Sequence, residues 1–186
     1  ASPQYWITAT LGEAYLVGKK ETVWFNNYRF AFREVTGSTN ERTSIVSMLP
    51  PKTFSGHTLW VGTTQDQRQD LFYTAICNSF CFDWVARLQV GTHMTLFVMK
   101  QLPMPRLKAG DPTFDAIVER AARLTCTHPD FAQLWEVVMG TAWDASQRVT
   151  VPPARQALRD ELDALVARLY GLSRSDFDHL LGAFPR

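Results

Sequence analysis

The chain has 186 residues, of which 46% are hydrophobic and 20% charged, enough apolar material for the core of one large domain or two small ones. The ordinary charged fraction argues against intrinsic disorder, and no apolar run approaches the ~20 residues of a transmembrane helix. The net charge of +1 hides an asymmetry, because residues 1–110 carry +4 and residues 111–186 carry −3. This surplus slightly favours nucleic acid as the partner of the first part.

The first third of the chain has the composition of β-structure. Apolar and β-branched runs, separated by Gly, Asn, Ser and Pro, predict short strands. The expected strands cover residues 5–7, 23–25, 28–35, 43–49 and 58–62. Pro50-Pro51 ends the fourth of them, because proline cannot donate a hydrogen bond to a β-ladder.

The strand at 28–35 and the turn after it are the densest polar feature of the sequence. Alternation places Tyr28, Phe30 and Phe32 on one face, so Arg29 and Arg33 share the other. The turn concentrates hydrogen-bonding side chains, namely Ser38, Thr39, Asn40, Arg42 and Thr43. Hydroxyl and amide groups beside arginines suit phosphate oxygens and base edges. The alternative is a surface strand whose arginines pair with nearby glutamates.

Residues 66–88 change to helical spacing, with an apolar stripe so broad that we expect one helix buried on most sides. Cys77 and Cys81 lie one helical turn apart within this apolar run, and Cys126 is the third cysteine. The odd count and the apolar surroundings favour buried thiols over a disulfide framework or a zinc site. Free thiols also indicate a reducing, cytoplasmic compartment.

A second polar cluster follows Gly91, which ends that helix. It consists of Thr92, His93 and Thr95, with Lys100 beyond it, and the alternative to a binding edge is a plain turn. We expect Met94–Met99 to form a short apolar strand. Residues 102–105 contain two prolines and are expected to be extended.

From residue 111 the pattern is helical throughout. Asp111 is expected to cap a helix that has Pro112 at its first position. Pro129 begins the next helix, with His128 in its cap, and a leucine stripe covers residues 153–170. Gly171 stops that helix, and the last one begins with a capping box formed by Ser173 and Asp176, with His179 on its exposed side.

Together these patterns predict an α+β fold. We expect a mixed β-sheet with a buried helix in residues 1–110 and a helical C-terminal part in residues 111–186. The sequence contains no phosphate-binding Gly-Lys-Ser/Thr loop, dinucleotide fingerprint or metalloprotease helix. We therefore predict no catalytic, cofactor-binding or metal-binding residues in this chain.

Five segments in sequence order carry a resemblance to a known family. They are Arg33–Val35 with Ser38–Thr43, Phe82–Arg87 with Val90–His93, Gln101–Pro105, Thr141–Asp144, and Leu169–Ser173 with Phe184-Pro185. This order resembles the C-terminal region of large restriction-modification methylases. These are adenine-N6 DNA methyltransferases of type II and BREX-like phage-defence systems that carry a TaqI-like specificity domain. Val90 and Thr95 stand where the family pattern has glycine and asparagine.

The resemblance implies that the chain is the target-recognition region of a bacterial, cytoplasmic enzyme. In such an enzyme an upstream domain binds S-adenosylmethionine and methylates a flipped adenine. The implied partners are double-stranded DNA and that upstream methyltransferase domain, with no cofactor and no activity in this chain alone. Because the chain starts bluntly at Ala1, we expect a fragment excised from a longer protein.

The predicted DNA-binding residues combine the polar turn with nearby cations. They are Arg29, Arg33, Ser38, Thr39, Asn40, Arg42, Thr43, Lys52, Thr92, His93, Thr95 and Lys100. We expect the cations to hold backbone phosphates, and the groups nearer the bases to be Thr39, Asn40, Thr92 and His93.

A motif shared by modules that read different sequences is better suited to holding the fold or the DNA backbone than to choosing bases. The resemblance therefore implies that Arg33, Arg42 and Thr43 are positioning residues. Base reading is then expected at Ser55–Thr58 or around Thr92. The alternative function is a docking or scaffold module whose helical part binds the methylase core or a partner domain.

Overall fold

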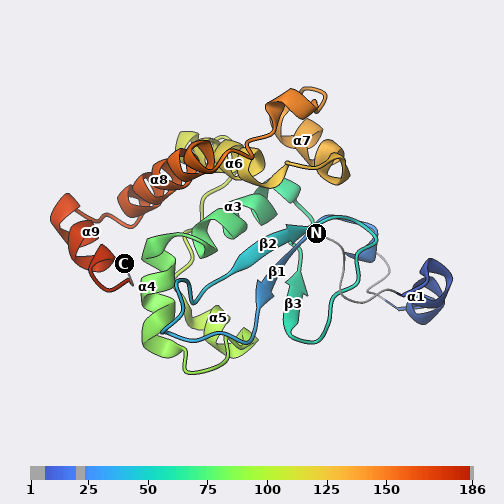
Figure 1. The fold of residues 1–186 in the computed structure, drawn as a ribbon, viewed down its shortest axis with the longest axis horizontal. Helices are drawn as coiled ribbons and strands as arrows, with labels where there is room; N and C mark the ends of the chain where they lie inside the picture. Colours follow the sequence, from blue (N-terminus) through green and yellow to red (C-terminus); the bar gives the residue numbers. More distant parts are fainter. Residues whose placement is uncertain (1–6, 20–23, 185–186) are drawn as a thin grey trace.

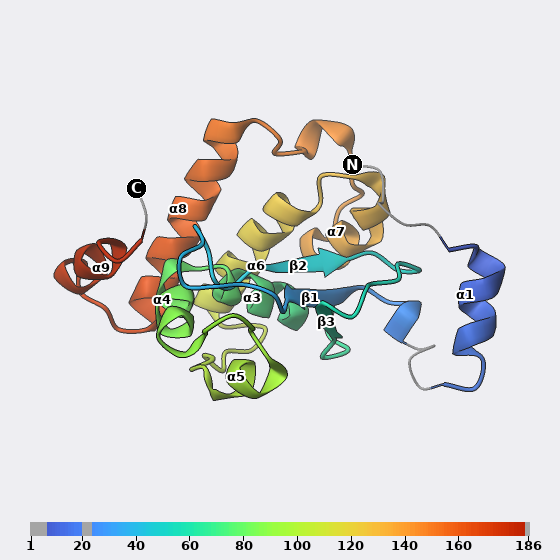
Figure 2. The ribbon, with the colours of Figure 1, turned by 60° about the horizontal axis from the view of Figure 1, so that its bottom comes forward.

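A computed structural model describes residues 7–19 and 24–184 of the chain. A small antiparallel sheet lies at its centre, with α6, α7 and α8 on one side and α5 on the other, while α1 and α9 lie at opposite ends (Figures 1 and 2). The helices are α1 (Ala9–Leu16), α3 (Gln67–Cys77), α4 (Phe80–Gln89), α5 (Leu96–Gln101), α6 (Pro112–Thr125), α7 (Ala132–Met139), α8 (Pro152–Leu169) and α9 (Arg174–Leu181). Two short 3₁₀ helices, η1 (Pro129–Phe131) and η2 (Ala145–Gln147), precede α7 and α8.

The sheet confirms the α+β class. Its strands are β1 (Arg29–Arg33), β2 (Val46–Leu49) and β3 (Leu59–Gly62), in the order β2-β1-β3. Both pairings are antiparallel. The expectation of a mixed sheet is therefore wrong for the described strands. The predicted strands at 28–35, 43–49 and 58–62 are thus confirmed with shorter bounds.

Two other predicted strands near the N-terminus fare differently. The strand at 5–7 lies largely outside the described residues, as does Val23 of the strand at 23–25. Trp24 and Phe25 are helical, so the strand expected there is wrong. Phe25 is buried and contacts the ring of Phe54 with centroids 4.5 Å apart, so tertiary packing outweighs the β-propensity of this aromatic run.

The single helix predicted for 66–88 is two helices, because the chain breaks at Asn78-Ser79. Asn78 uses its side-chain amide to bond both backbone groups of Val46 in β2. Ser79 then caps α4 by accepting a hydrogen bond from Phe82 N. The expected burial is confirmed, since the stripe of α3 includes the fully buried Phe72.

The apolar strand predicted at Met94–Met99 is also wrong, because residues 96–101 form α5. Thr95 caps this helix through a hydrogen bond from Val98 N at 3.3 Å. A six-residue apolar run fits either period, and here the cap decides the outcome. The extended segment expected after it is confirmed, beginning with the extended backbone of Leu102.

The C-terminal helices begin and end where the sequence predicts. Asp111 accepts from Thr113 N and Phe114 N, with Pro112 at the first position of α6. The His128 cap, the exposed His179, the left-handed Gly171 (φ +71°) and the capping box of Ser173 with Asp176 are confirmed.

One hydrophobic core extends across residue 110, where the sequence suggested a boundary. It includes buried residues from Tyr28 in the β-rich part to Phe184 after α9. Its centre is the contact between α3 and α6, where the rings of Phe72 and Phe114 stack with centroids 4.9 Å apart. Among the residues described, no helix is long and apolar enough to cross a membrane.

Candidate nucleic-acid interface

Two side chains of α4 hold the polar turn that follows β1. Asp83 Oδ1 accepts hydrogen bonds from the backbone N–H groups of Thr43 (2.8 Å) and Ser44. The second carboxylate oxygen of Asp83 accepts from Arg87 Nε at 3.1 Å. Arg87 also donates to three turn carbonyl oxygens, those of Ser38 at 2.7 Å, Asn40 at 2.8 Å and Glu41 at 2.6 Å. The turn is therefore fixed through its backbone.

Hydrogen bonds within the turn use most of its polar side chains. Thr36 Oγ1 donates to Thr43 O at 2.8 Å, and Thr43 Oγ1 donates to Gly37 O at 3.1 Å. The Asn40 side-chain oxygen, in the orientation that satisfies its neighbours, accepts from Gly37 N (3.2 Å) and Arg33 Nη2 (3.1 Å). Thr43 and Asn40 thus stabilise the turn, whereas the side chains of Ser38 and Thr39 are exposed.

The second polar cluster lies beside the turn, so the structure brings the two sequence-predicted clusters together. Thr36 N donates to Thr92 O at 3.1 Å, and Val35 forms an isolated β-bridge with His93. Thr92 and His93 are exposed, with Thr92 Oγ1 at 2.9 Å from His93 Nδ1. Together with the exposed turn residues they form a polar rim, defined as Ser38, Thr39, Thr92 and His93.

Arg42 stacks on aromatic rings next to this rim. Its guanidinium carbon lies 3.4 Å from the ring centre of Phe80 and 5.4 Å from that of Phe184. Burial lowers the pKa of Arg42, and the nearby charge of Asp163 opposes that shift. Its Nη1 atom is buried without a hydrogen-bond partner among the described residues. A buried guanidinium nitrogen without a hydrogen-bond partner costs free energy, and Arg29 Nε and Arg68 Nε share this condition.

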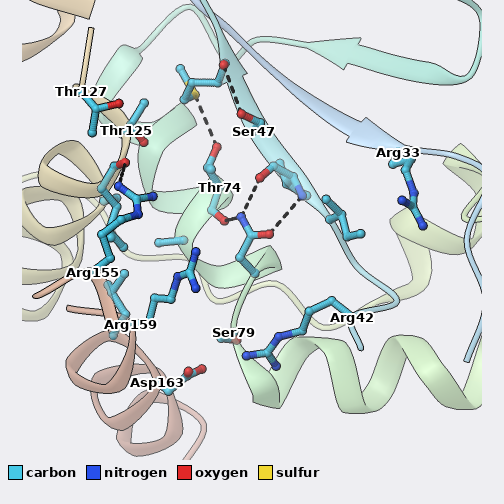
Figure 3. Close-up of a pocket in the computed structure, with 18 of the residues that line it drawn as sticks. Arg33, Arg42, Ser47, Thr74, Ser79, Thr125, Thr127, Arg155, Arg159 and Asp163 are labelled. Carbon is cyan, nitrogen blue, oxygen red and sulfur yellow. Dashed lines mark hydrogen bonds between the residues drawn. The ribbon is translucent and has the colours of Figure 1, made fainter. Parts of the chain in front are cut away.

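An arginine-lined cleft of about 810 Å³ opens between β2 and α8 (Figure 3). We call it the arginine cleft, after Arg33, Arg42, Arg155 and Arg159 on its lining. One wall is β2 with the junction of α3 and α4, and the other consists of residues of α6 and α8. Its lining also includes the carboxylates of Glu41 and Asp163, so the arginines outnumber the acids.

Arg155 and Arg159 come from the acidic half of the chain and were missed in the sequence. Their four-residue spacing places both on one face of α8, a signal that the sequence does contain. Arg155 Nη1 donates to the carbonyl oxygens of Leu124 (3.0 Å) and Val149 (2.9 Å). Burial and the charge of Arg159 lower the pKa of Arg155, whereas Arg159 itself is exposed.

Asp163 lies on α8 one turn beyond Arg159, at the edge of the cleft. Its side chain accepts a hydrogen bond from Phe80 N at 2.8 Å, and only 6% of the residue is exposed. Burial raises its pKa to about 6, against the opposing effects of that hydrogen bond and of Arg42. Because the folded state binds this proton more tightly than the unfolded chain, the free energy of unfolding falls as the pH rises from about 4 to about 6.

Asp163→Asn keeps an oxygen acceptor for Phe80 N and removes this titration. We expect the fall in unfolding free energy between pH 4 and pH 6 to be smaller by about 2–3 kcal/mol than in the unaltered protein. Urea unfolding at several pH values measures it, with Asp178→Asn, an exposed carboxylate outside the cleft, as the charge control. An unchanged pH profile would mean that Asp163 is not the group that carries the proton.

The remaining predicted residues lie away from the cleft. Arg29 is 7% exposed, its Nη2 donates to Thr53 O at 2.7 Å, and Lys52 is at the same end of β1, opposite Arg33. Lys100 is exposed on α5. Thr95 uses its hydroxyl as the cap of α5.

Comparison of the chain with family models, curated proteins and solved structures finds no match.

The predicted burial of the cysteines is confirmed, and burial raises the pKa of Cys77 to about 12 and that of Cys81 to about 11. No cluster of three or more potential metal ligands occurs in the described part of the chain. The arginine cleft, with the polar rim on the neighbouring turn, is the candidate site, and its arginines are suited to binding an anion.

Proposed function

We propose that this chain is a DNA-recognition module of a bacterial adenine-N6 DNA methyltransferase. In this proposal an upstream domain of the same polypeptide binds S-adenosylmethionine and carries out the methylation, while this chain contributes no catalytic group. The observation that carries the proposal is that four arginines, from three separate segments, line one cleft. Guanidinium groups bind phosphate oxygens in bidentate geometry, which makes such a set suitable for a nucleic-acid backbone.

Two further observations support the proposal. The exposed hydroxyl and imidazole groups of the polar rim lie next to the segment that carries Arg33, where they can reach base edges. The segments behind the family resemblance also contact one another, since Arg87 of one segment bonds to the turn carbonyls of another. The position of the polar rim supports contact with DNA. The bonds between the segments support a fold shared with the family that they resemble.

Neutralising exposed cleft arginines is expected to reduce the salt dependence of DNA binding. The double variant Arg33→Gln/Arg159→Gln should flatten the plot of log affinity against log salt by about two units, because each phosphate contact contributes about one. Both residues are exposed, so the fold should be retained although the bond from Arg33 to the Asn40 side chain is lost. The measurement is titration of labelled duplex DNA at several salt concentrations.

The matched control is Arg168→Gln/Arg174→Gln, which removes the same charge from exposed arginines outside the cleft. Equal slopes for the two double variants would assign binding to net charge instead of the cleft. An undetectable or salt-independent affinity of the unaltered protein would refute DNA binding and favour a docking or scaffold role.

A further inference from the structure

The backbone of β2 presents one edge to the arginine cleft. Arg33 N donates to Ile45 O at 3.0 Å, and antiparallel strands alternate bonded and outward-facing residues. Val46 and Met48 therefore point their backbone groups away from β1. At Val46 the edge is already occupied, because the Asn78 amide accepts from Val46 N at 3.1 Å and donates to Val46 O at 2.8 Å. Met48, two residues farther on, lines the cleft.

The contact between Asn78 and Val46 shows which chemistry this edge accepts. It is a planar group with a donor and an acceptor side by side, and the edges of nucleobases carry such pairs. The register places the N–H and C=O of Met48 on the same edge of β2 as those of Val46, and Met48, which is 3% exposed, lines the cleft. Its carbonyl oxygen also accepts from Ser47 Oγ at 3.3 Å. The lining nearby adds the apolar side chains of Leu124 and Phe131, against which a base or sugar can pack.

The arginines supply a partner for a phosphate attached to such a base. Arg42 and Asn78 both line the cleft, and the buried Nη1 of Arg42 has no hydrogen-bond partner among the described residues. Arg159 enters the same cleft from α8 (Figure 3). The cleft thus combines arginine cations with the hydrogen-bonding edge of β2. An anion such as inorganic phosphate would contact only the arginines, whereas a nucleotide could contact both.

The size of the cleft limits what can enter it. About 810 Å³ lies within the range of roughly 300–1,000 Å³ typical of small-ligand pockets. A double helix is too wide to enter such a cleft, so its phosphates can reach only the exposed arginines of the lining, Arg33 and Arg159. We propose that the arginine cleft binds a single unpaired nucleotide of a DNA strand, with its phosphate at Arg42 and Arg159 and its base edge at Met48. This inference rests on the proposed function and names the ligand of the cleft.

The test compares two duplexes that share one labelled strand. In the first the complementary strand is complete, and in the second it lacks the nucleotide that pairs with the middle position, which leaves a single unpaired nucleotide. Fluorescence anisotropy is expected to show affinity at least about tenfold higher for the second duplex. Thr125→Trp, which adds bulk at the lining without removing a cation, should abolish this gain, so that the two duplexes bind with equal affinity. Arg159→Gln should reduce the gain as well, with Arg168→Gln as its control.

Melting temperatures establish that each variant is folded, and the exposed Arg159→Gln decides the matter if Thr125→Trp does not fold. A nucleoside monophosphate and inorganic phosphate, added separately, distinguish a free nucleotide or a phosphate group from a nucleotide in a strand. If inorganic phosphate removes the higher affinity for the duplex with the unpaired nucleotide as effectively as the monophosphate does, the base is not recognised. That result would overturn the proposed contact between the base edge and Met48. Equal affinity for the two duplexes would overturn the inference and leave the proposed function standing, whereas no binding of either would overturn both.

Discussion

Replacing Asp83 by alanine is expected to lower the free energy of unfolding by about 3–5 kcal/mol. The carboxylate is completely buried and accepts hydrogen bonds from Thr43 N, Ser44 N and Arg87. Without it, two backbone N–H groups and a guanidinium that is 8% exposed lose their acceptor together. The polar turn should then loosen, because Arg87 also holds three of its carbonyl oxygens.

Urea unfolding measures this cost, and amide exchange at residues 36–44 should show that the turn opens before the sheet. The control is Asp115→Ala, which breaks an ion pair of 2.7 Å with Arg68 at a half-exposed position. That change should cost less than about 1 kcal/mol, because water screens the pair. A cost for Asp83→Ala no larger than that of the control would contradict the structural role of the carboxylate.

The polar turn illustrates what the sequence predicted and what it did not. Alternation located β1, and the density of polar residues marked the turn as special. The sequence also contains Asp83 and Arg87 four residues apart, a spacing that predicts a pair on one helix face. It does not show that this pair contacts residues forty positions earlier, because that contact depends on how α4 packs against α3, α5, α8 and α9.

Two of the errors in secondary structure, the single helix at 66–88 and the strand at 94–99, have a common cause. Asn78-Ser79 and Thr95 are good capping residues, but each lies beside a longer apolar pattern that suggested a continuous element. In both places one side-chain hydrogen bond at a helix start outweighs the apolar periodicity. Caps act through single contacts, so hydrophobic patterns alone do not locate them.

The arginine cleft lay beyond prediction for a different reason. Its arginines come from β1, the turn and α8, and the buried Leu162 and Val166 fix α8 against the rest of the fold. The net charge was summed separately over residues 1–110 and 111–186. That sum places Arg155 and Arg159 in the acidic part of the chain, so it gave no reason to predict them as cations of a binding site. Tertiary packing, which the count ignores, moves these two cations to the basic side.

The resemblance segments have a physical explanation that is independent of DNA. Tyr170 donates its hydroxyl hydrogen bond to Pro103 O at 2.6 Å, and Trp143 Nε1 donates to Cys126 O at 2.8 Å. Tyr170 and Trp143 each belong to one of the five segments that resemble the methylase family, and each contact joins that segment to a distant part of the chain. Such residues hold the fold together.

Replacing Phe114 by alanine is expected to destabilise both sides of residue 110 together, by about 3–5 kcal/mol. Its fully buried ring stacks on Phe72, so its loss leaves a cavity where α3 meets α6. Hydrogen exchange should show β1 and α8 losing protection in one cooperative transition. Phe97→Ala, at a residue that is 75% exposed, is the matched control and should change stability by less than about 0.5 kcal/mol. Two separate transitions, with only the C-terminal one shifted, would show instead that residues 1–110 and 111–186 fold independently.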